Sequence, residues 1–438
     1  MPNDFSRRRF LSAAAVTGVA ARGSTARPAA LGGAPVRTEP FPAWPVYEAT
    51  EEQALLSTLR SGGWFRGNGR AVSQFEESYA RMTGSKYCLA TANGTSALIG
   101  SMAALGVQAG DEVILPPYTF VACVNAILML HALPVFVDTD PETFQIDARK
   151  LEAAITDRTA AIMPVHLGGN VADLDAILLI ARRRNVPVVE DACQAHMAQW
   201  RGRHVGTYGR AGCFSFQASK NLNSGEGGAI LTSDEELAER CYAFHNNSRG
   251  RKIVDYDFSY SNRGANLRMP EFQAALLVAQ MKRLDEQARL RESNAQYLTS
   301  MLREIPGILP AKQYDGCTRN AYHLYMFRYK KEQAAGMPRA KFLKALKAEG
   351  VPADGGYSPL NKEPFIKNTL ESRGFQAIYS KDRVRRWQER NQCPENDRLC
   401  EEAVWLRQTY FLGTRRDMEQ IAEAVRKVMT HGAELTRA

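Results

Sequence analysis

The 438-residue sequence lacks several features that would define its class at once. Its eight cysteines include no Cys-x-x-Cys pair, which argues against a zinc site or a disulfide framework. No basic block is interleaved with aromatic residues, so the sequence gives no nucleic-acid-binding signature. Beyond residue 40 no apolar run is long enough to cross a bilayer, and we find no internal repeats. With 45% hydrophobic residues, the chain has instead the composition of a globular protein with two domains or more.

The first 40 residues carry a distinct charge pattern. They hold six arginines against Asp4 and Glu39, so they contribute +4 of the formal net charge of +9 and leave a modest +5 elsewhere. Arg7-Arg8 precedes the small, apolar run Leu11–Ala21, which is too short for a permanent transmembrane helix. This arrangement resembles a twin-arginine export signal, which implies a periplasmic or other extracytoplasmic location. The alternative is a basic tail on a cytoplasmic protein, or a start codon assigned too early.

Short apolar runs alternate with amphipathic segments between residues 84 and 232. We predict buried strands over Lys86–Thr91, Glu112–Leu115, Pro134–Val137, Ala160–Pro164, Val186–Glu190, Gly212–Phe216 and Ala229–Thr232. We predict helices over Ser96–Leu105, Phe120–Leu130, Ala148–Ile155 and Leu174–Arg184. This alternation indicates an α/β fold with a mostly parallel sheet that helices cover on both faces. Such sheets bind ligands outside the carboxyl ends of their strands, where Asp191 and Ser215 fall.

The C-terminal part has a different pattern. A long amphipathic stretch over residues 269–303 is predicted to link a large domain to a smaller one. Beyond it we predict a strand over Tyr322–Tyr329 and helices over Lys341–Glu349 and Met418–Met429, which indicates a small α+β domain. Polar residues 366–392 are interpreted as a mobile loop over the site, or as plain surface. We therefore divide the chain into a leader and linker (1–40), a large domain (41–285) and a small domain (286–438).

Lys220 lies in an apolar, glycine-flanked segment, Phe214–Gly228, downstream of a carboxylate in Val188–Asp191. Partial burial favours the neutral form of a lysine amine, which can react with an aldehyde. A carboxylate can keep the nitrogen of a pyridine ring protonated, so that the ring withdraws electrons. Together they are what a pyridoxal 5'-phosphate (PLP) enzyme requires, although a single lysine is more often a solvated surface group.

Other segments fit the same cofactor. Thr91–Ser96 lies between a predicted strand and helix, where free amides and the helix dipole bind anions; a simple N-cap is the alternative. An aromatic residue of Pro117–Phe120 would stack on the ring, or it packs in the core. Gln194 is placed to hydrogen-bond the ring hydroxyl, and Ser215 to bind the phosphate.

These segments resemble the DegT/DnrJ/StrS family of sugar and cyclitol aminotransferases, which have PLP fold type I. The similarity extends from about residue 40 to residue 430, and its most specific motif is Ser-Phe-x-x-x-Lys-x-x-x-x-Gly-Glu-Gly-Gly. The matching runs are Ala92–Leu98, Thr119–Ala122, Pro164–Ile177, Glu190–His196, Phe214–Gly228 and Asn266–Glu271.

The resemblance implies a role for each matching residue around the cofactor ring. Lys220 would form the Schiff base with the cofactor aldehyde, and Asp191 would pair with the pyridine nitrogen. Gln194 would contact the ring hydroxyl, and Phe120, rather than Tyr118, would stack on the ring.

The resemblance also implies how the phosphate is bound and how the chains assemble. The amides of Gly94 and Thr95, with the hydroxyl of Ser215, would hold the phosphate. Family members are typically homodimers with shared active sites, and Asn266 would reach the partner's phosphate. The resemblance implies no metal ion.

For function, the resemblance implies ping-pong transamination of a keto sugar or keto cyclitol, with glutamate or glutamine as the amino donor. The alternatives are a PLP-dependent dehydratase or aromatising enzyme, similar to the aminohydroxybenzoate synthases around Arg319–His323 and Cys393–Trp405, and a non-catalytic PLP-fold sensor. Export would put nucleotide-linked sugars, which are cytoplasmic, in doubt as substrates. Three histidines either line the acceptor pocket or are structural: His166, His196 and His323.

Overall fold

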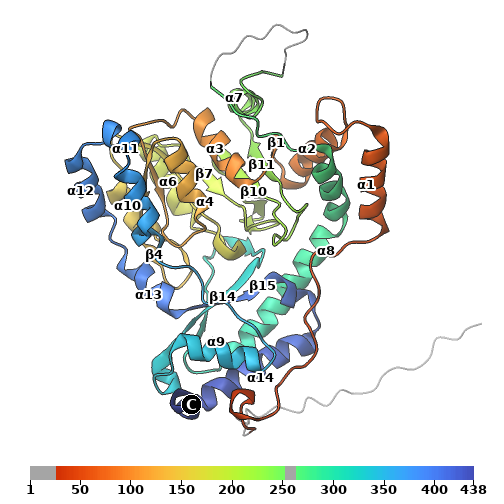
Figure 1. Ribbon diagram of the computed structural model, residues 1–438, viewed down its shortest axis with the longest axis vertical. Coiled ribbons are helices and arrows are strands. Elements are labelled where there is room, and N and C mark those ends of the chain that lie inside the picture. Colours follow the sequence, from red (N-terminus) through yellow and green to blue (C-terminus); the bar gives the residue numbers. More distant parts are fainter. Residues whose placement is uncertain (1–25, 252–262) are drawn as a thin grey trace, which may run out of the picture.

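A computed structural model of the chain describes residues 26–251 and 263–438 (Figure 1). The expected twin-arginine signal lies outside these residues, so export stays a prediction. Within the described residues, no helix combines the length and the apolar character that a membrane span requires.

Seven strands form the central sheet, in the order β3-β2-β6-β7-β10-β11-β1. Parallel pairs join β3 to β2, β2 to β6 and β7 to β10, and isolated parallel bridges at Ile162–Val188 and Val165–Asp191 connect β6 with β7. Within this sheet, β11 is the one strand that runs in the opposite direction to the others. The strands are β1 (Tyr87–Thr91), β2 (Glu112–Leu115), β3 (Leu133–Phe136), β6 (Thr159–Ile162), β7 (Val189–Asp191), β10 (Ala211–Ser215) and β11 (Gly228–Thr232). All but the first residue of β1 and two of β6 are buried, as their apolar sequences predict.

Helices cover the sheet and connect its strands (Figure 1). They are α2 (Ala71–Thr83), α3 (Gly94–Ala104), α4 (Ala122–Met129), α5 (Leu151–Ala154), α6 (Leu174–Arg184) and α7 (Glu235–His245). Short strands lie at the margins: β4 (Thr139–Asp140) pairs with β5 (Gln145–Ile146), and β8 (Gln199–Trp200) lies between β9 (Arg203–His204) and β13 (Cys317–Arg319). This arrangement confirms the predicted α/β fold with a mostly parallel sheet.

The long helix α8 (Glu271–Leu302) runs from the larger part of the molecule into the smaller one (Figure 1). There the sheet β12-β14-β15 and the helices α9 and α14 enclose a second apolar core, which includes Leu298, Phe342 and Val425. These elements are β12 (Ile308–Pro310), β14 (Leu324–Tyr329), β15 (Ala403–Arg407), α9 (Arg339–Ala348), α14 (Arg415–Thr430) and α15 (Gly432–Arg437). The predicted helices and strands agree with the observed ones within three residues at either end.

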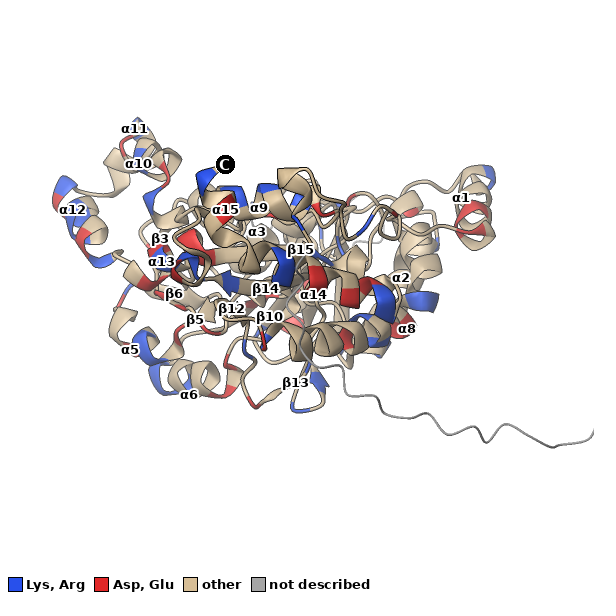
Figure 2. Cartoon of the chain, turned by 90° about the horizontal axis from the view of Figure 1, so that it is seen from below, with Lys and Arg blue, Asp and Glu red and all other residues tan. Residues whose placement is uncertain are grey.

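The segment interpreted as a mobile loop over residues 366–392 is helical, and that interpretation was wrong. It contains α10 (Pro364–Leu370), α11 (Arg373–Ile378) and α12 (Lys381–Arg390), and α13 (Pro394–Glu402) follows. Apolar anchors spaced along these helices, among them Ile366, Phe375 and Trp387, are buried in the core of the large part of the molecule. Charged residues are frequent on these helices (Figure 2), so the few apolar anchors do not stand out in the sequence of the segment.

Two segments pack on a different core from the one that their position in the sequence suggests. Residues 360–402 contribute to the large core, although they lie in the predicted small domain. The N-terminal residues Ala29 and Val36 bind the small part of the molecule instead, because their amides donate to the buried carboxylate of Glu349 at 2.8 and 3.0 Å. Lys427 forms an ion pair with the same carboxylate. The division into domains itself stays a prediction.

Candidate active site

A cavity of about 570 Å3 lies at the carboxyl ends of the central strands. Seven of the eight predicted site residues line it: Gly94, Thr95, Phe120, Asp191, Gln194, Ser215 and Lys220. These residues are far apart in the sequence, so the fold alone brings them together. Tyr118 does not line the cavity and is completely buried in the core.

The pairing of two strands places the first of these residues. β7 and β10 run parallel, with Asp191 opposite Cys213, so Asp191 and Ser215 lie at the same edge of the sheet. Asp191 is only 5% exposed, and the amide of Cys193 donates to its Oδ1 at 3.0 Å. A buried carboxylate is thereby presented to the cavity at a fixed position.

Glu190 fixes the same strand from the other face of the sheet. Its buried carboxylate accepts three backbone N–H bonds of 2.7 Å from residues 206–209 and one bond of 3.0 Å from Nε2 of His166. Burial alone would raise the pKa of Glu190, but the bonds from His166 and the amides lower it. The amide of Ala172 donates to Nδ1 of His166, so the imidazole proton is on Nε2. His166 therefore has a structural role.

The first turn of α3 faces Ser215. The side chain of Asn93 caps this helix by accepting from the amide of Ser96 at 2.8 Å. The amides of Gly94 and Thr95 precede that capped amide, and the first turn of a helix offers them no intrahelical acceptor. A Cβ on Gly94 would lie 2.7 Å from Cβ of Ser215, so this approach requires glycine. Free amides, a helix dipole and an adjacent hydroxyl are the donors that a phosphate needs.

Lys220 lies on a closed loop that follows β10. The amide of Phe216 donates to the carbonyl of Gly227 across the base of this loop, and the indole of Trp44 donates to the carbonyl of Ala218 at 2.9 Å. Burial lowers the pKa of the Lys220 amine, although nearby thiols and Asp191 oppose the effect. The amine is therefore neutral more often than that of a solvated lysine, as attack on an aldehyde requires.

The side chain of Gln194 is held at both ends. Its Oε1 accepts from the amide of Gly168 at 2.8 Å, and its Nε2 donates to the hydroxyl of Tyr357 at 3.3 Å. Gly168 has φ of 66°, a conformation that glycine adopts without strain. The amide group of Gln194 is thus already oriented at the cavity wall.

The two remaining histidines have different positions. His196 does not line the cavity: its Nε2 donates to the carbonyl of Ser215 at 2.8 Å, and burial lowers its pKa to about 3. The neutral ring of His196 therefore supports the backbone of Ser215. His323 does line the cavity, and Oδ1 of Asn221 lies 3.2 Å from its Nδ1. Burial lowers the pKa of His323 well below its usual range, so its ring is neutral.

Sequence reasoning missed several residues that line the cavity. Thr119 precedes α4 and begins the recognised run Thr119–Ala122, and Cys123 follows that run as the second residue of the helix. Tyr357 and Trp405 come from beyond α8 and pack on the core of the large part. Trp405 ends the run Cys393–Trp405, but no local pattern placed either residue at the cavity. Glu226, within the recognised glycine-rich motif, adds a carboxylate.

Asn266 is the one predicted site residue that does not line this cavity. It forms an isolated antiparallel bridge with Asn246, and the adjacent Leu267 accepts from the amide of Ala92, close to the start of α3. Asn266 therefore lies near the start of α3 but outside the cavity of its own chain. Its predicted role toward a partner subunit stays a prediction.

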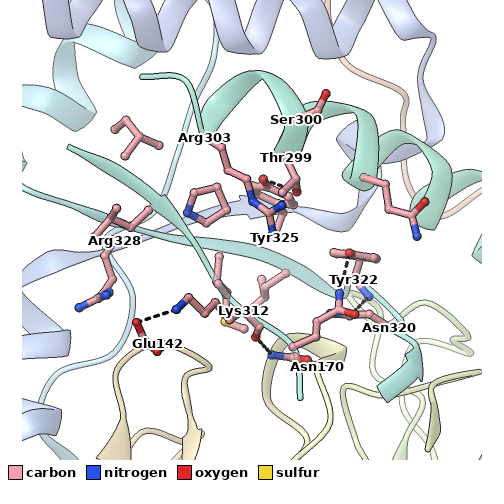
Figure 3. A pocket seen from close by; sticks show the side chains of 18 residues that line it. Glu142, Asn170, Thr299, Ser300, Arg303, Lys312, Asn320, Tyr322, Tyr325 and Arg328 are labelled. Atoms are coloured by element: carbon pink, nitrogen blue, oxygen red, sulfur yellow. Dashed lines mark hydrogen bonds and ion pairs between the residues drawn. The ribbon is translucent and has the colours of Figure 1, made fainter. Parts of the chain in front are cut away.

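A second, larger cavity of about 760 Å3 lies between α8, β12 and β14 (Figure 3). Several of its polar side chains are already paired with one another: Lys312 with Glu142, Tyr322 with Gln313, and Tyr325 with Thr299. It contains neither a buried lysine nor a buried carboxylate beside one. We therefore assign the chemistry to the smaller cavity.

The lining of the smaller cavity fits PLP. It provides a lysine amine, a buried carboxylate, an oriented amide and a helix N-terminus closed by a glycine, which together match the aldehyde, ring and phosphate of this cofactor. Within residues 26–251 and 263–438, no group of three His, Cys, Asp or Glu side chains is placed to hold a metal ion. The fold and the site define a PLP-dependent enzyme of fold type I.

Comparison with known proteins gives the same class. The sequence pattern of the DegT/DnrJ/EryC1/StrS aminotransferase family matches residues 46–426. A relative from Streptoalloteichus tenebrarius, provisionally named L-glutamine:3-amino-2,3-dideoxy-scyllo-inosose aminotransferase, is 41% identical over 92% of this chain and 98% of its own. The L-glutamine:2-deoxy-scyllo-inosose aminotransferase of the same organism is 38% identical over 92% and 97%.

A solved structure supports the fold. The crystal structure of 3-amino-5-hydroxybenzoic acid synthase superposes with a TM-score of 0.81 and 32% identity, covering 90% of this chain and all of that one. The chain belongs to the DegT/DnrJ/EryC1/StrS aminotransferase family, and its cofactor is PLP.

We predict that Gly94→Ala weakens cofactor binding without unfolding the protein. The new methyl group displaces Ser215, so its hydroxyl would lose a hydrogen bond to the charged phosphate worth roughly 1.5–3 kcal/mol, and the dissociation constant for PLP rises on the order of tenfold or more. Fluorescence titration of the apoenzyme measures this change.

The matched control is Gly100→Ala on the same helix. A Cβ there meets only Cδ1 of Ile230 at 3.4 Å and a ring carbon of Phe244 at 3.9 Å. It leaves PLP affinity unchanged, and equal affinities for the two variants would contradict the proposed cradle.

Proposed function

We propose that this chain transfers the amino group of L-glutamine to the ketone of a cyclitol. The observation that carries this proposal is the placement of Lys220 and Asp191 in one cavity at the carboxyl ends of the strands. The relatives named above, which are L-glutamine aminotransferases for scyllo-inosose derivatives, support the choice of donor and acceptor.

The cavity residues supply binding and proton transfer. When bound, PLP supplies an aldehyde that carries the amino group and an electron-withdrawing ring. Asp191 would pair with the ring nitrogen, Gln194 with the ring hydroxyl, and Phe120 would cover the ring. The Lys220 amine would take the proton from Cα of the donor, and its lowered pKa suits it to act as this base.

The phosphate end uses groups of a different kind. The amides of Gly94 and Thr95 and the hydroxyl of Ser215 would bind the phosphate. His196 holds the backbone of Ser215 and remains neutral, so it adds no competing charge. This division leaves Lys220 free for chemistry, because no lysine is needed for the phosphate.

The charge of the cavity favours an acceptor without a phosphate group. Of the described residues that line it, Lys220 is the only lysine or arginine, and Glu226 and Asp191 are acidic. A nucleotide-linked sugar carries a diphosphate, which proteins usually bind with arginine or lysine. A neutral or amino-substituted cyclitol makes no such demand, and Tyr357, Trp405 and His323 offer aromatic and polar surface for its ring.

The alternative is a ring-aromatising reaction of the aminohydroxybenzoate synthase type. The structural similarity to 3-amino-5-hydroxybenzoic acid synthase favours it, at 32% identity. The higher identity of 38–41% to cyclitol aminotransferases favours transamination. The products distinguish the two, because only the alternative yields an aromatic compound.

We predict that Lys220 is the residue that PLP modifies. Borohydride reduction of the loaded enzyme, followed by peptide mass mapping, should place the cofactor on Lys220, and Lys220→Ala should lose both the modification and turnover. Lys86→Ala, which changes an exposed lysine paired with Glu235, should behave as wild type. Modification of another lysine would overturn the assignment.

The attachment should also depend on pH. The protonated amine cannot attack the aldehyde, so the attachment rate increases as the pH rises through the pKa of Lys220. Because that pKa is lowered from the usual 10.5, the rate should reach its plateau below this pH. Stopped-flow absorbance of apoenzyme mixed with PLP measures it; a plateau at or above pH 10.5 would contradict the effect of burial.

We predict that glutamine converts the bound cofactor to its pyridoxamine form, and that 2-deoxy-scyllo-inosose restores the original spectrum. Initial rates at varied concentrations of both substrates should give the parallel lines of a ping-pong mechanism. A nucleotide-linked keto sugar serves as the comparison acceptor. Faster turnover with that sugar, or an aromatic product, would contradict the proposal.

We also propose a homodimer whose active sites are shared. Large apolar side chains are exposed within or just after α1 (Ala49–Ser61), including Leu59, Trp64 and Phe65. The guanidinium of Arg268 lies 5.4 Å from the centre of the Phe65 ring, so this apolar surface adjoins the segment that contains Asn266. Phe120 at the cavity is itself 55% exposed, as a residue covered by a partner would be.

The dimer can be tested by mixing two inactive variants. A mixed dimer of Lys220→Ala and Asn266→Ala protomers has one site with both changes and one with neither. Since half of the dimers are mixed at equal expression, co-expression should restore roughly one quarter of the wild-type activity. Each variant expressed alone is the control, and activity no higher than that of the controls would contradict shared sites.

A further inference from the structure

Cys123 contacts Asp191 directly. It is the second residue of α4, it is 1% exposed, and its Sγ lies 2.8 Å from Oδ2 of Asp191. The amide of Cys193 donates to the other oxygen, Oδ1, at 3.0 Å. Each oxygen of the buried carboxylate thus has one donor from the protein, and the two donors together fix the plane of the carboxylate.

The direction of these hydrogen bonds follows from the number of protons. Burial raises the pKa of the Cys123 thiol, so the sulfur keeps its hydrogen beside the carboxylate. That single S–H donates to Asp191, which can only accept when ionised. The hydroxyl of Thr119, 3.2 Å from the same sulfur, must therefore be the donor to Sγ. The result is a relay from Thr119 through Cys123 to Asp191.

We propose that Cys123 is a positioning residue, whose S–H holds the Asp191 carboxylate in the orientation that receives the pyridine nitrogen of PLP. This inference rests on the proposed pairing of Asp191 with that nitrogen. A carboxylate held by one donor on each oxygen keeps its remaining lone pairs in a fixed direction, and binding the ring then requires no reorientation. Without the thiol donor, Oδ2 would be a buried oxygen with one fewer partner.

Packing is the competing explanation, because Cys123 also belongs to the apolar core of the large part of the molecule. The two explanations predict opposite rankings for two substitutions. Cys123→Val fills the space and removes the donor, whereas Cys123→Ser keeps a donor and is less apolar. If packing alone matters, valine replaces cysteine well and serine does not.

We expect Cys123→Ser to bind PLP within about twofold of wild type, and Cys123→Val to bind about tenfold more weakly, as the loss of a hydrogen bond to a charged group predicts. Equilibrium titration of the apoenzyme by fluorescence measures both constants. The absorbance maximum of the bound cofactor should shift in the valine variant alone. Melting of the apoenzymes shows that both variants are folded.

Cys241 provides the matched control, since it is completely buried on α7 and outside the cavity lining. Its serine and valine variants should both bind PLP as wild type does. If Cys123→Val binds PLP as tightly as Cys123→Ser, positioning by the thiol is overturned.

Asp191→Asn separates this inference from the proposed function. Unchanged PLP affinity in that variant would overturn the pairing of Asp191 with the ring, and the positioning role with it. Weak binding by Asp191→Asn together with normal binding by Cys123→Val would overturn the role of Cys123 alone.

Discussion

The parallel pairing of β7 with β10 is the constraint on which the site depends. It aligns Asp191 with Cys213, so that a carboxylate and, two residues beyond Cys213, the hydroxyl of Ser215 emerge at one edge of the sheet. The loop with Lys220 then begins directly after β10, and the N-terminus of α3 packs against Ser215 because Gly94 has no side chain. The buried bonds of Glu190 to His166 and to the 206–209 amides stabilise this pairing from behind. The buried carboxylate, the hydroxyl and the lysine loop of the cavity therefore all depend on these two neighbouring strands.

Burial has two opposite consequences at this edge. It lowers the pKa of Lys220, which makes the amine reactive, and it leaves Asp191 with few water partners, which a charged group tolerates poorly. The protein compensates with short, directed donors: the amide of Cys193 and the thiol of Cys123 on Asp191. The histidines nearby are neutral, because burial and the positive charge of Lys220 lower the pKa of His196 and of His323. Burial in the apolar core and the hydrogen bonds of the polar groups thus act together on the charges of Lys220 and Asp191.

The sequence predicted the sheet, its helices and most of the cofactor-side residues, because each of these has a local signature. Strands that are buried on both faces appear in the sequence as apolar runs. Lys220, Gly94 and Ser215 lie in short motifs at or after the ends of such strands. Helices over residues 366–392 escaped notice because anchors such as Phe375 and Trp387 are sparse in a charged segment. Tyr357 and Trp405 escaped notice for another reason. Their place at the cavity depends on how two parts of the chain pack, and no periodicity within either segment records that contact.

Side chains from two parts of the chain line the cavity, and each part would bind a different ligand, the cofactor or the acceptor. The strand ends of the large sheet present the groups that match the cofactor, whose structure is constant. The segments with His323, Tyr357 and Trp405 come from beyond α8 and contain no part of β7, β10 or the turn at Gly94. At least two links cross between them: the contact of His323 with Asn221, the residue after Lys220, and the bond from Gln194 to the hydroxyl of Tyr357. Because this bond ties the group expected at the ring hydroxyl to the acceptor side, a change of acceptor surface that removes the Tyr357 hydroxyl also frees Gln194. The division between cofactor chemistry and acceptor binding is therefore incomplete wherever such a link makes one pair of residues serve both requirements.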